Sequence, residues 1–274
     1  MNPMSKKARP KSKRPVDAAA GAVAQSPREK ARAKKTGASH PGPAGAAREN
    51  AAAFRAAARF IRGGESADRP GAQGAERRER EQGRGAEWAL AQGRLIHERD
   101  LDAITLLSNS TSEHEVRYPS ADGRVVKKTW PGFYGQIPVW RSGRIEREPA
   151  LPSQYLDRQA LQNEVFGSDL RLEGVTISER PSMIIGERSG QPSFVVSQRF
   201  IEAADPRFPK PNEAQLAAFL EAHGFQPLPR SYFGWLRALD GIVVLDARAD
   251  NFILSAEGVI PIDLQMAVIP APRS

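Results

Sequence analysis

The sequence of 274 residues contains no cysteine, so neither a disulfide framework nor a thiolate metal site is available to it. Its histidines are too scattered along the chain to suggest a zinc site; they are His40, His97, His114 and His223. No apolar run approaches the roughly 18 residues needed to cross a membrane, and no apolar segment follows the basic N-terminus as in a signal peptide. These absences predict a soluble, cytoplasmic protein with no membrane partner.

Positive charge is concentrated near the N-terminus. Residues 1–100 hold 22 basic and 11 acidic residues, out of 40 and 32 in the whole chain. Residues 1–45 also have almost no bulky apolar side chains, so they cannot bury enough surface to offset the entropy lost on ordering. We therefore expect a disordered basic tail over residues 1–45.

A basic tail of this kind has more than one possible partner. It can bind nucleic acid through the release of counterions, attach to an acidic protein, or serve only to keep the chain in solution. The sequence has no interleaved aromatic residues for stacking on bases and no recognition-helix motif. Any binding of nucleic acid by the tail is therefore expected to be non-specific.

The C-terminal part of the chain has a regular spacing of Asp and Asn. Asp246 and Asn251 stand five positions apart in LDARADNF, and Asp263 follows in IPIDLQ after two short apolar runs, 252–254 and 259–262. Those runs predict a β-hairpin that returns Asp263 to the neighbourhood of Asn251. Taken singly, each aspartate can simply cap a turn or end a strand. Together they supply what phosphoryl transfer needs, with Asp246 as base and Asn251 and Asp263 as ligands of Mg²⁺.

Phosphoryl transfer also needs a cation on the nucleotide phosphates, and a lysine upstream can provide it. Residues 116–118 and 124–129 flank a turn and predict a β-hairpin whose second strand ends in Lys127 and Lys128. Alternation along a strand sends these two side chains to opposite faces, so only one can enter a cleft. The order Val-Val-Lys favours Lys127, and Lys128 remains the alternative.

A lysine that points inward is usually held by a carboxylate of an adjacent helix. Residues 154–169 have an apolar stripe at helical spacing, with Ser153 as a plausible N-cap. Of the acidic residues on this predicted helix, Glu164 lies nearest the middle of the segment and is the expected partner of Lys127. Asp157 is the alternative. Either carboxylate can instead belong to a solvated face.

Five segments together resemble the bacterial kinase-like domain of polyvalent proteins from phages and conjugative elements, a divergent relative of serine/threonine/tyrosine kinases. They cover much of residues 111–265 and read SEHEVRYPSADGRVVKKTWPGFYG, PSQYLDRQALQNEVFGSDLRLEGV, FVVSQRFI with AFLEAHGF, and GIVVLDARADNFILSAEGVIPIDLQ. The resemblance implies that ATP and Mg²⁺ are bound, with Lys127 on the nucleotide phosphates. It also implies that the strand over 194–201, with Gln198 and Phe200, leads to the backbone that meets the adenine.

The sequence departs from ordinary protein kinases at several points. Residues 108–112 are small hydroxyl residues and asparagine in place of a glycine-rich phosphate loop. Val244 stands where a histidine usually precedes the catalytic aspartate, and Asp263-Leu264-Gln265 replaces Asp-Phe-Gly. Eleven residues follow Asp263, which leaves no room for an activation loop or a helical platform for peptide substrates. The class of the acceptor, a protein or a small molecule, therefore stays open.

These features predict an α+β protein with a minimal bilobal kinase-like fold. We expect a helix over 46–62, a linker to about residue 85 and a short helix near Trp88 to Ile96. An N-lobe would cover residues 101–205. A truncated C-lobe would cover residues 206–274, with helices over 212–224 and 232–239. The expected function is transfer of the γ-phosphoryl group of Mg-ATP to a hydroxyl; the alternative is an inactive kinase-like module that binds a partner.

Overall fold

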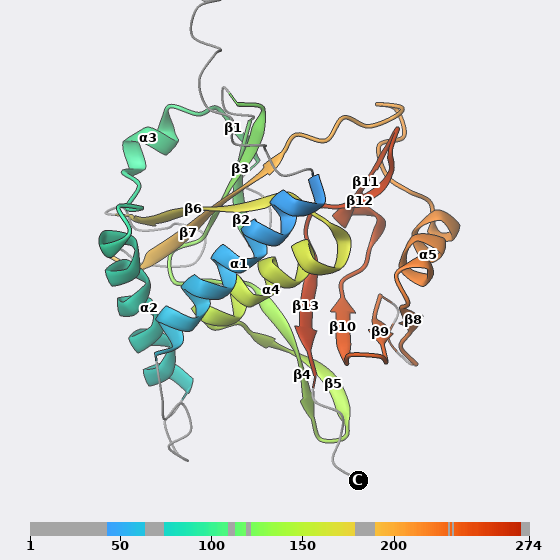
Figure 1. Ribbon diagram of the computed structural model, residues 1–274, viewed down its shortest axis with the longest axis horizontal. Coiled ribbons are helices and arrows are strands. Elements are labelled where there is room, and N and C mark those ends of the chain that lie inside the picture. Colours follow the sequence, from blue (N-terminus) through green and yellow to red (C-terminus); the bar gives the residue numbers. More distant parts are fainter. Residues whose placement is uncertain are drawn as a thin grey trace, which may run out of the picture. The chain divides into compact units, whose positions relative to one another are not determined.

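The largest sheet among the described residues is antiparallel and has five strands in this computed structural model (Figure 1). The strands follow the order β1-β2-β3-β7-β6 and are Leu106–Ser108, His114–Arg117, Arg124–Thr129, Pro192–Arg199 and Leu170–Ile177. The structure describes residues 43–63, 74–108, 113–118, 122–178, 190–229, 231 and 233–269. All of them belong to a single unit, residues 41–274.

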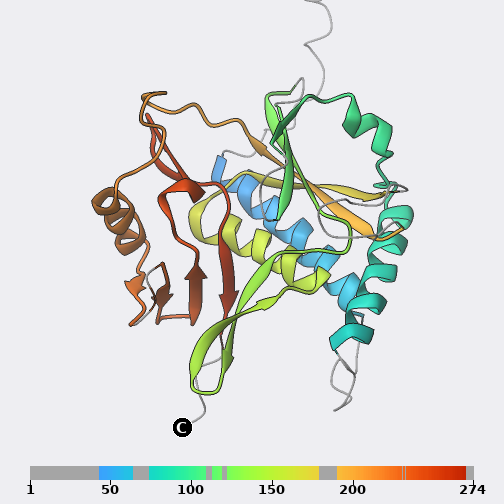
Figure 2. The same ribbon diagram turned by 180° about the vertical axis from the view of Figure 1, so that it is seen from behind.

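The hairpin predicted around Lys127 is confirmed as β2 and β3, with Val116 opposite Lys127. A second hairpin follows β3 at once and consists of β4 (Gln136–Arg141) and β5 (Arg144–Pro149). Its tight turn places Ser142 and Gly143 at φ values of 50° and 80°, the left-handed backbone that two-residue hairpins require. The second hairpin extends away from the sheet towards the C-terminal strands (Figure 2), and β4 packs against β13 (Gln265–Val268).

Two long helices cover one face of the five-stranded sheet. They are α1 (Pro43–Arg62) and α4 (Pro152–Phe166), which lie side by side and bring Phe54, Ile61 and Tyr155 into one apolar core with Phe194 of β7 (Figure 1). Burial of this apolar surface is the main source of stability for both helices. The helices α2 (Gly74–Ala91) and α3 (Glu98–Asp102) connect α1 to the sheet.

The C-terminal part has a core of its own, which includes Leu220, Val244 and Met266. Its strand β10 (Ile242–Leu245) is fully buried and lies within a sheet of order β13-β10-β9-β8, where β9 is Trp235–Arg237 and β8 is Gln226–Pro227. The helix α5 (Glu213–Ala222), within the helix predicted over 212–224, begins at a capping box in which Asn212 and Gln215 exchange hydrogen bonds. A 3₁₀ turn, η2 (Ala249–Asn251), joins β10 to the hairpin of β11 (Phe252–Ser255) and β12 (Gly258–Pro261).

The α+β class and the hairpin before Asp263 are confirmed, and three local predictions are wrong. The linker expected up to residue 85 is helical from Gly74, because Gly85, Trp88 and Ala89 are buried on one side of α2. The short helix expected near Trp88 to Ile96 is therefore only the end of α2, which stops at Ala91. The cap of α4 is Leu151 rather than Ser153, which lies inside the helix.

The third error concerns the helix expected over 232–239, where the structure has strand β9. Trp235 and Leu236 pack into two different apolar clusters, which is the alternation of a strand rather than the stripe of a helix. Pairing with β10 favours the strand, because it gives hydrogen-bond partners to backbone N–H and C=O groups that a helix of a few residues would leave unpaired.

The basic tail predicted over residues 1–45 lies outside the described residues except for its last three positions, which begin α1. Residues 109–112 of the predicted phosphate-loop region also lie outside the described residues. Among the described helices, none is both long and apolar enough to span a membrane.

Candidate active site

Five of the site residues predicted from the sequence line one cavity of about 250 Å³, whereas Asp246 and Glu164 do not line it. Its walls include Lys127 of β3, Gln198 of β7, Asn251 of η2 and Asp263, which follows β12. They also include Phe200, a residue that is 51% exposed. The cavity therefore lies between the five-stranded sheet and the C-terminal hairpin, and it unites residues far apart in the sequence.

Asp246 sits at the end of the buried strand β10 in a strained backbone conformation. Its φ is 60°, in the left-handed region that few residues other than glycine adopt, although aspartate tolerates it better than most. The Asn251 amide donates hydrogen bonds to the Asp246 carbonyl at 2.7 Å and to its carboxylate at 3.0 Å. Arg147 of β5 approaches the other carboxylate oxygen at 3.5 Å. These hydrogen bonds close residues 246–251 into a loop and fix the side chains of Asp246 and Asn251 relative to each other.

Lys127 enters the cavity, and Lys128 does not. The Lys127 ammonium donates hydrogen bonds to the Gln198 side chain at 3.3 Å and to the Ile262 carbonyl. Burial lowers the pKa of Lys127, and the negative charge of Asp263 acts in the opposite direction. Lys128 points to the other face of the sheet, where its ammonium lies 3.4 Å from Glu115 and 3.6 Å from Glu98. Strand alternation therefore separates the two lysines as expected.

The partner proposed for Lys127 on α4 is wrong. Glu164 accepts hydrogen bonds from Arg55 of α1 at 2.8 and 3.1 Å, and Asp157 pairs with Arg55 and Arg62. Both carboxylates therefore face α1 rather than the cavity. The reason is the packing of α1 along the outer side of α4, which provides arginines for the acidic residues there. No sequence pattern within α4 reveals which helix will cover it.

Asp263 is surrounded by positive groups while one third of its side chain stays exposed. Burial alone would raise the pKa of its carboxyl, but a hydrogen bond from His114 and the charges of His114, Arg158 and Lys127 outweigh burial. The pKa of Asp263 therefore lies well below its ordinary value. This carboxylate stays ionised at neutral pH, as a ligand of a hard cation must.

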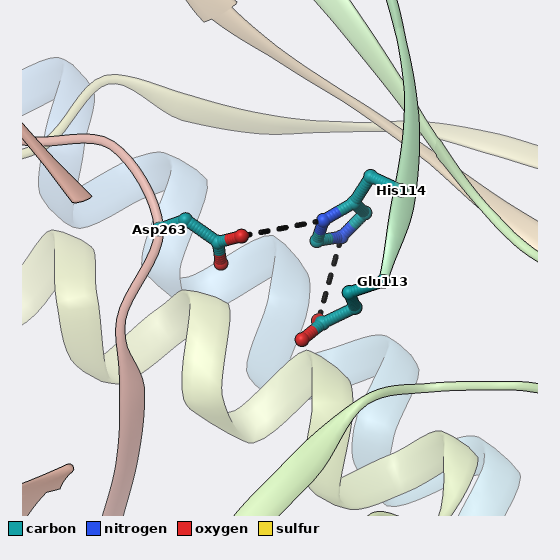
Figure 3. A group of neighbouring side chains, drawn as sticks. All are labelled: Glu113, His114 and Asp263. Atoms are coloured by element: carbon teal, nitrogen blue, oxygen red, sulfur yellow. Dashed lines mark ion pairs between the residues drawn. The ribbon is translucent and has the colours of Figure 1, made fainter. Parts of the chain in front are cut away.

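Sequence reasoning missed three buried residues behind Asp263, namely Glu113, His114 and Arg158. Figure 3 shows the His114 ring between the carboxylates of Glu113 and Asp263, at 3.5 and 3.6 Å respectively. Arg158 of α4 donates to both carboxylate oxygens of Glu113. Neither the Glu-His pair in SEHEV nor Arg158 in an apolar stripe stands out in the sequence, because their meeting depends on tertiary packing. The only available signal was a histidine beside an acidic residue at a strand start.

The donor set at the cavity suits Mg²⁺. Asn251 supplies an amide oxygen and Asp263 a carboxylate oxygen, both of which line the cavity, and hard cations prefer oxygen ligands. Glu113, His114 and Asp263 also lie close enough together to hold an ion. However, Glu113 already compensates the charge of Arg158, and Lys127 is nearby, so a cation placed among these three would meet two positive neighbours.

Comparisons with models of protein families, with curated proteins and with solved structures found no match for this chain. The functional assignment therefore depends on the residues and geometry described above.

Proposed function

We propose that the protein is an ATP-dependent phosphotransferase with a minimal bilobal kinase-like fold, which transfers the γ-phosphoryl group of Mg-ATP to a hydroxyl. The observation that carries the proposal is the convergence of Lys127, Asn251 and Asp263 on one cavity, together with the hydrogen bond that the Asn251 amide donates to the Asp246 carboxylate. These four residues come from three separate segments of the chain. Their order along the chain and their types match the parts that phosphoryl transfer requires.

Each residue has a distinct role in this proposal. Lys127 binds nucleotide phosphate, and its burial and short contacts hold the ammonium in place before the ligand arrives. Asn251 and Asp263 would hold Mg²⁺, which neutralises charge on the transferring phosphoryl group when it is bound. Asp246 accepts the proton of the attacking hydroxyl, since its carboxylate is 24% exposed and fixed by Asn251.

Gln198 and Phe200 complete the nucleotide site in this proposal. The Gln198 amide donates to the Pro261 carbonyl at 3.2 Å while its oxygen accepts from Lys127, so it connects β3 to the C-terminal hairpin. Phe200 offers an exposed aromatic face at the cavity wall, which suits a base. Its backbone N–H already donates to Gly123, so the ring rather than this amide is the group available to a ligand.

The test is incubation with γ-labelled ATP and Mg²⁺, with Asp246→Asn alongside. Asparagine tolerates the left-handed backbone at position 246 and removes only the charge, so this variant is expected to fold and bind nucleotide without turnover. Released phosphate and the mass of the protein report on transfer. Asp240→Asn is the matched control, because it removes a carboxylate from an exposed pair with Arg237 away from the cavity. Equal turnover by both variants would contradict the role given to Asp246.

A second candidate is a kinase-like module that binds nucleotide or a partner without turnover. The observation that favours it is that both acidic candidates on α4, Glu164 and Asp157, pair with arginines of α1 instead of Lys127. In this case the unmodified protein would bind nucleotide and show no phosphate release, and Asp246→Asn would behave like the parent. An affinity for nucleic acid through residues 1–45 would then become the function to measure.

A further inference from the structure

His114 is buried and touches three functional groups at once. The residue is 3% exposed, and its Nε2 lies 3.1 Å from the Tyr155 hydroxyl and 3.5 Å from a Glu113 oxygen. Its Nδ1 faces the opposite way and lies 3.6 Å from an Asp263 oxygen (Figure 3). Partners on both sides therefore fix the ring so that a particular nitrogen faces Asp263.

Glu113 is itself held rigidly by α4. Arg158 is 1% exposed, binds both oxygens of Glu113, and donates to the Gln136 carbonyl at 3.2 Å. A buried guanidinium is costly without its carboxylate, so the ion pair resists separation. Gly135 adds a steric limit, because a Cβ at that position would lie 2.1 Å from a Glu113 oxygen.

These contacts form a continuous path from α4 to the cavity. It runs from Arg158 through Glu113 and His114 to Asp263, and each step is an ion pair or a contact of 3.6 Å or less. The acidic residues of α4 pair with α1 instead, so Arg158 is the charged side chain through which α4 meets this path. The position of α4 is in turn set by α1, which packs along its length.

We propose that His114 is a positioning residue that orients the Asp263 carboxylate towards the bound metal–nucleotide, and that Arg158 and Glu113 connect this orientation to α4. The inference rests on the proposed function. The physical reason is preorganisation: a carboxylate already held in one direction loses less freedom when it takes up an ion. Loss of such an outer partner typically lowers metal affinity by about 10- to 100-fold.

Two substitutions at position 114 separate positioning from mere packing. In His114→Asn the amide nitrogen takes the place of Nδ1, the atom that faces Asp263. In His114→Gln the amide extends to the place of Nε2 and faces Glu113 and Tyr155 instead. Both variants are polar and uncharged, so a purely structural role predicts the same effect for both.

The measurement is calorimetric binding of a non-hydrolysable ATP analogue, once with Mg²⁺ and once with EDTA, so that turnover is not needed. We expect His114→Asn to keep the Mg²⁺-dependent gain in affinity to within a few-fold. We expect His114→Gln to lose it by about 10-fold or more, with binding in EDTA unchanged. His223→Gln is the matched control, because His223 is a partly buried histidine that contacts the Phe219 carbonyl at the end of α5.

The outcomes distinguish this inference from the proposed function. If both variants at position 114 lose the gain equally, or neither loses it, the positioning role of His114 is overturned while the nucleotide site stands. If the unmodified protein shows no Mg²⁺-dependent gain, the proposed function fails and the inference fails with it. If both variants are unfolded by circular dichroism, the residue is structural and the positioning role is overturned as well.

Discussion

At the scale of single residues, the most informative positions are proposed site residues that have an unusual backbone conformation or an unusual electrostatic environment. Asp246 has a left-handed backbone, and Asp263 is surrounded by positive charge. The left-handed backbone costs free energy and persists only where the fold determines it strongly, whereas the positive neighbours of Asp263 stabilise its ionised form. They therefore provide precise places to test the proposed site.

The first residue-scale prediction concerns Asp263→Asn, which keeps the shape of the side chain and removes its charge. We expect the Mg²⁺-dependent part of nucleotide affinity to be lost, because a neutral amide is a poor ligand compared with a carboxylate. Binding isotherms with Mg²⁺ and with EDTA measure the effect. A variant that retained the full Mg²⁺ dependence would show that Asp263 is not a metal ligand, and Asp240→Asn serves again as the control.

A second prediction at this scale concerns Gly135→Ala. The φ of 70° at Gly135 disfavours alanine, and the added Cβ would also collide with the Glu113 carboxylate that Arg158 holds. Gly143→Ala is the matched control, with a φ of 80° and open space around its Cβ. Both should lose about 1 kcal/mol from backbone strain, and only Gly135→Ala should lose a further 1 to 3 kcal/mol. Denaturant unfolding of both variants gives the difference, and equal losses would rule out the collision.

At the scale of elements, the packing of α1 against α4 determines which acidic side chains are kept away from the cavity. Arg55 of α1 forms ion pairs with both Asp157 and Glu164 of α4. Phe54 and Ile61 of α1 lie in the apolar core. Most helical stability in proteins comes from packing of the apolar face rather than from helix propensity, so we attribute the order of α1 to this packing. The same contact turns the acidic face of α4 away from Lys127.

The element-scale prediction compares two phenylalanines of α1. Phe54 is fully buried, and Phe54→Ala should lower the free energy of unfolding by about 3 to 5 kcal/mol through lost burial and a residual cavity. Phe60 is 39% exposed on the same helix, beneath the guanidinium of Arg84, and Phe60→Ala should cost less than about 1 kcal/mol. Urea titrations of the two variants measure both values. Similar losses would mean that α1 does not pack as described.

At the scale of the whole molecule, two segments of the chain differ in composition. Residues 1–42 are basic and poor in apolar side chains, whereas the described unit contains both apolar cores. The first described helix already belongs to the core, so the boundary between the two lies close to Pro43.

The prediction at this scale uses two truncations. Removal of residues 1–42 should leave the melting temperature within a few degrees, because this segment has too little apolar surface to contribute to a core. It should also lower any affinity for DNA and flatten the dependence of that affinity on salt. Removal of residues 1–63 takes α1 away and should abolish the cooperative thermal transition. A large loss of stability in the shorter truncation would show that the tail is folded.

The sequence by itself determined the parts of this protein that depend on local pattern. The hairpins 114–129 and 252–261 and the capped helix from Glu213 follow from alternation, turn residues and the Asn212 cap, which act over a few residues. The strand β10 and the placement of Lys127, Asn251 and Asp263 at one cavity agree with the spacing of the motif. The two hairpins and the capped helix are each encoded within a short stretch of chain, whereas the meeting of Lys127 with Asn251 and Asp263 also requires the fold to bring distant segments together.

Only the tertiary structure decided which charged groups meet. Glu164 was expected at Lys127 and lies on Arg55, and the Glu113–His114–Arg158 cluster behind Asp263 was not foreseen. The strand β9 likewise replaces an expected helix, because pairing with β10 outweighs local preference. The physical reason is common to all three cases. The free energy of an ion pair or a strand pair depends on a partner from a distant segment, and no local pattern specifies that partner.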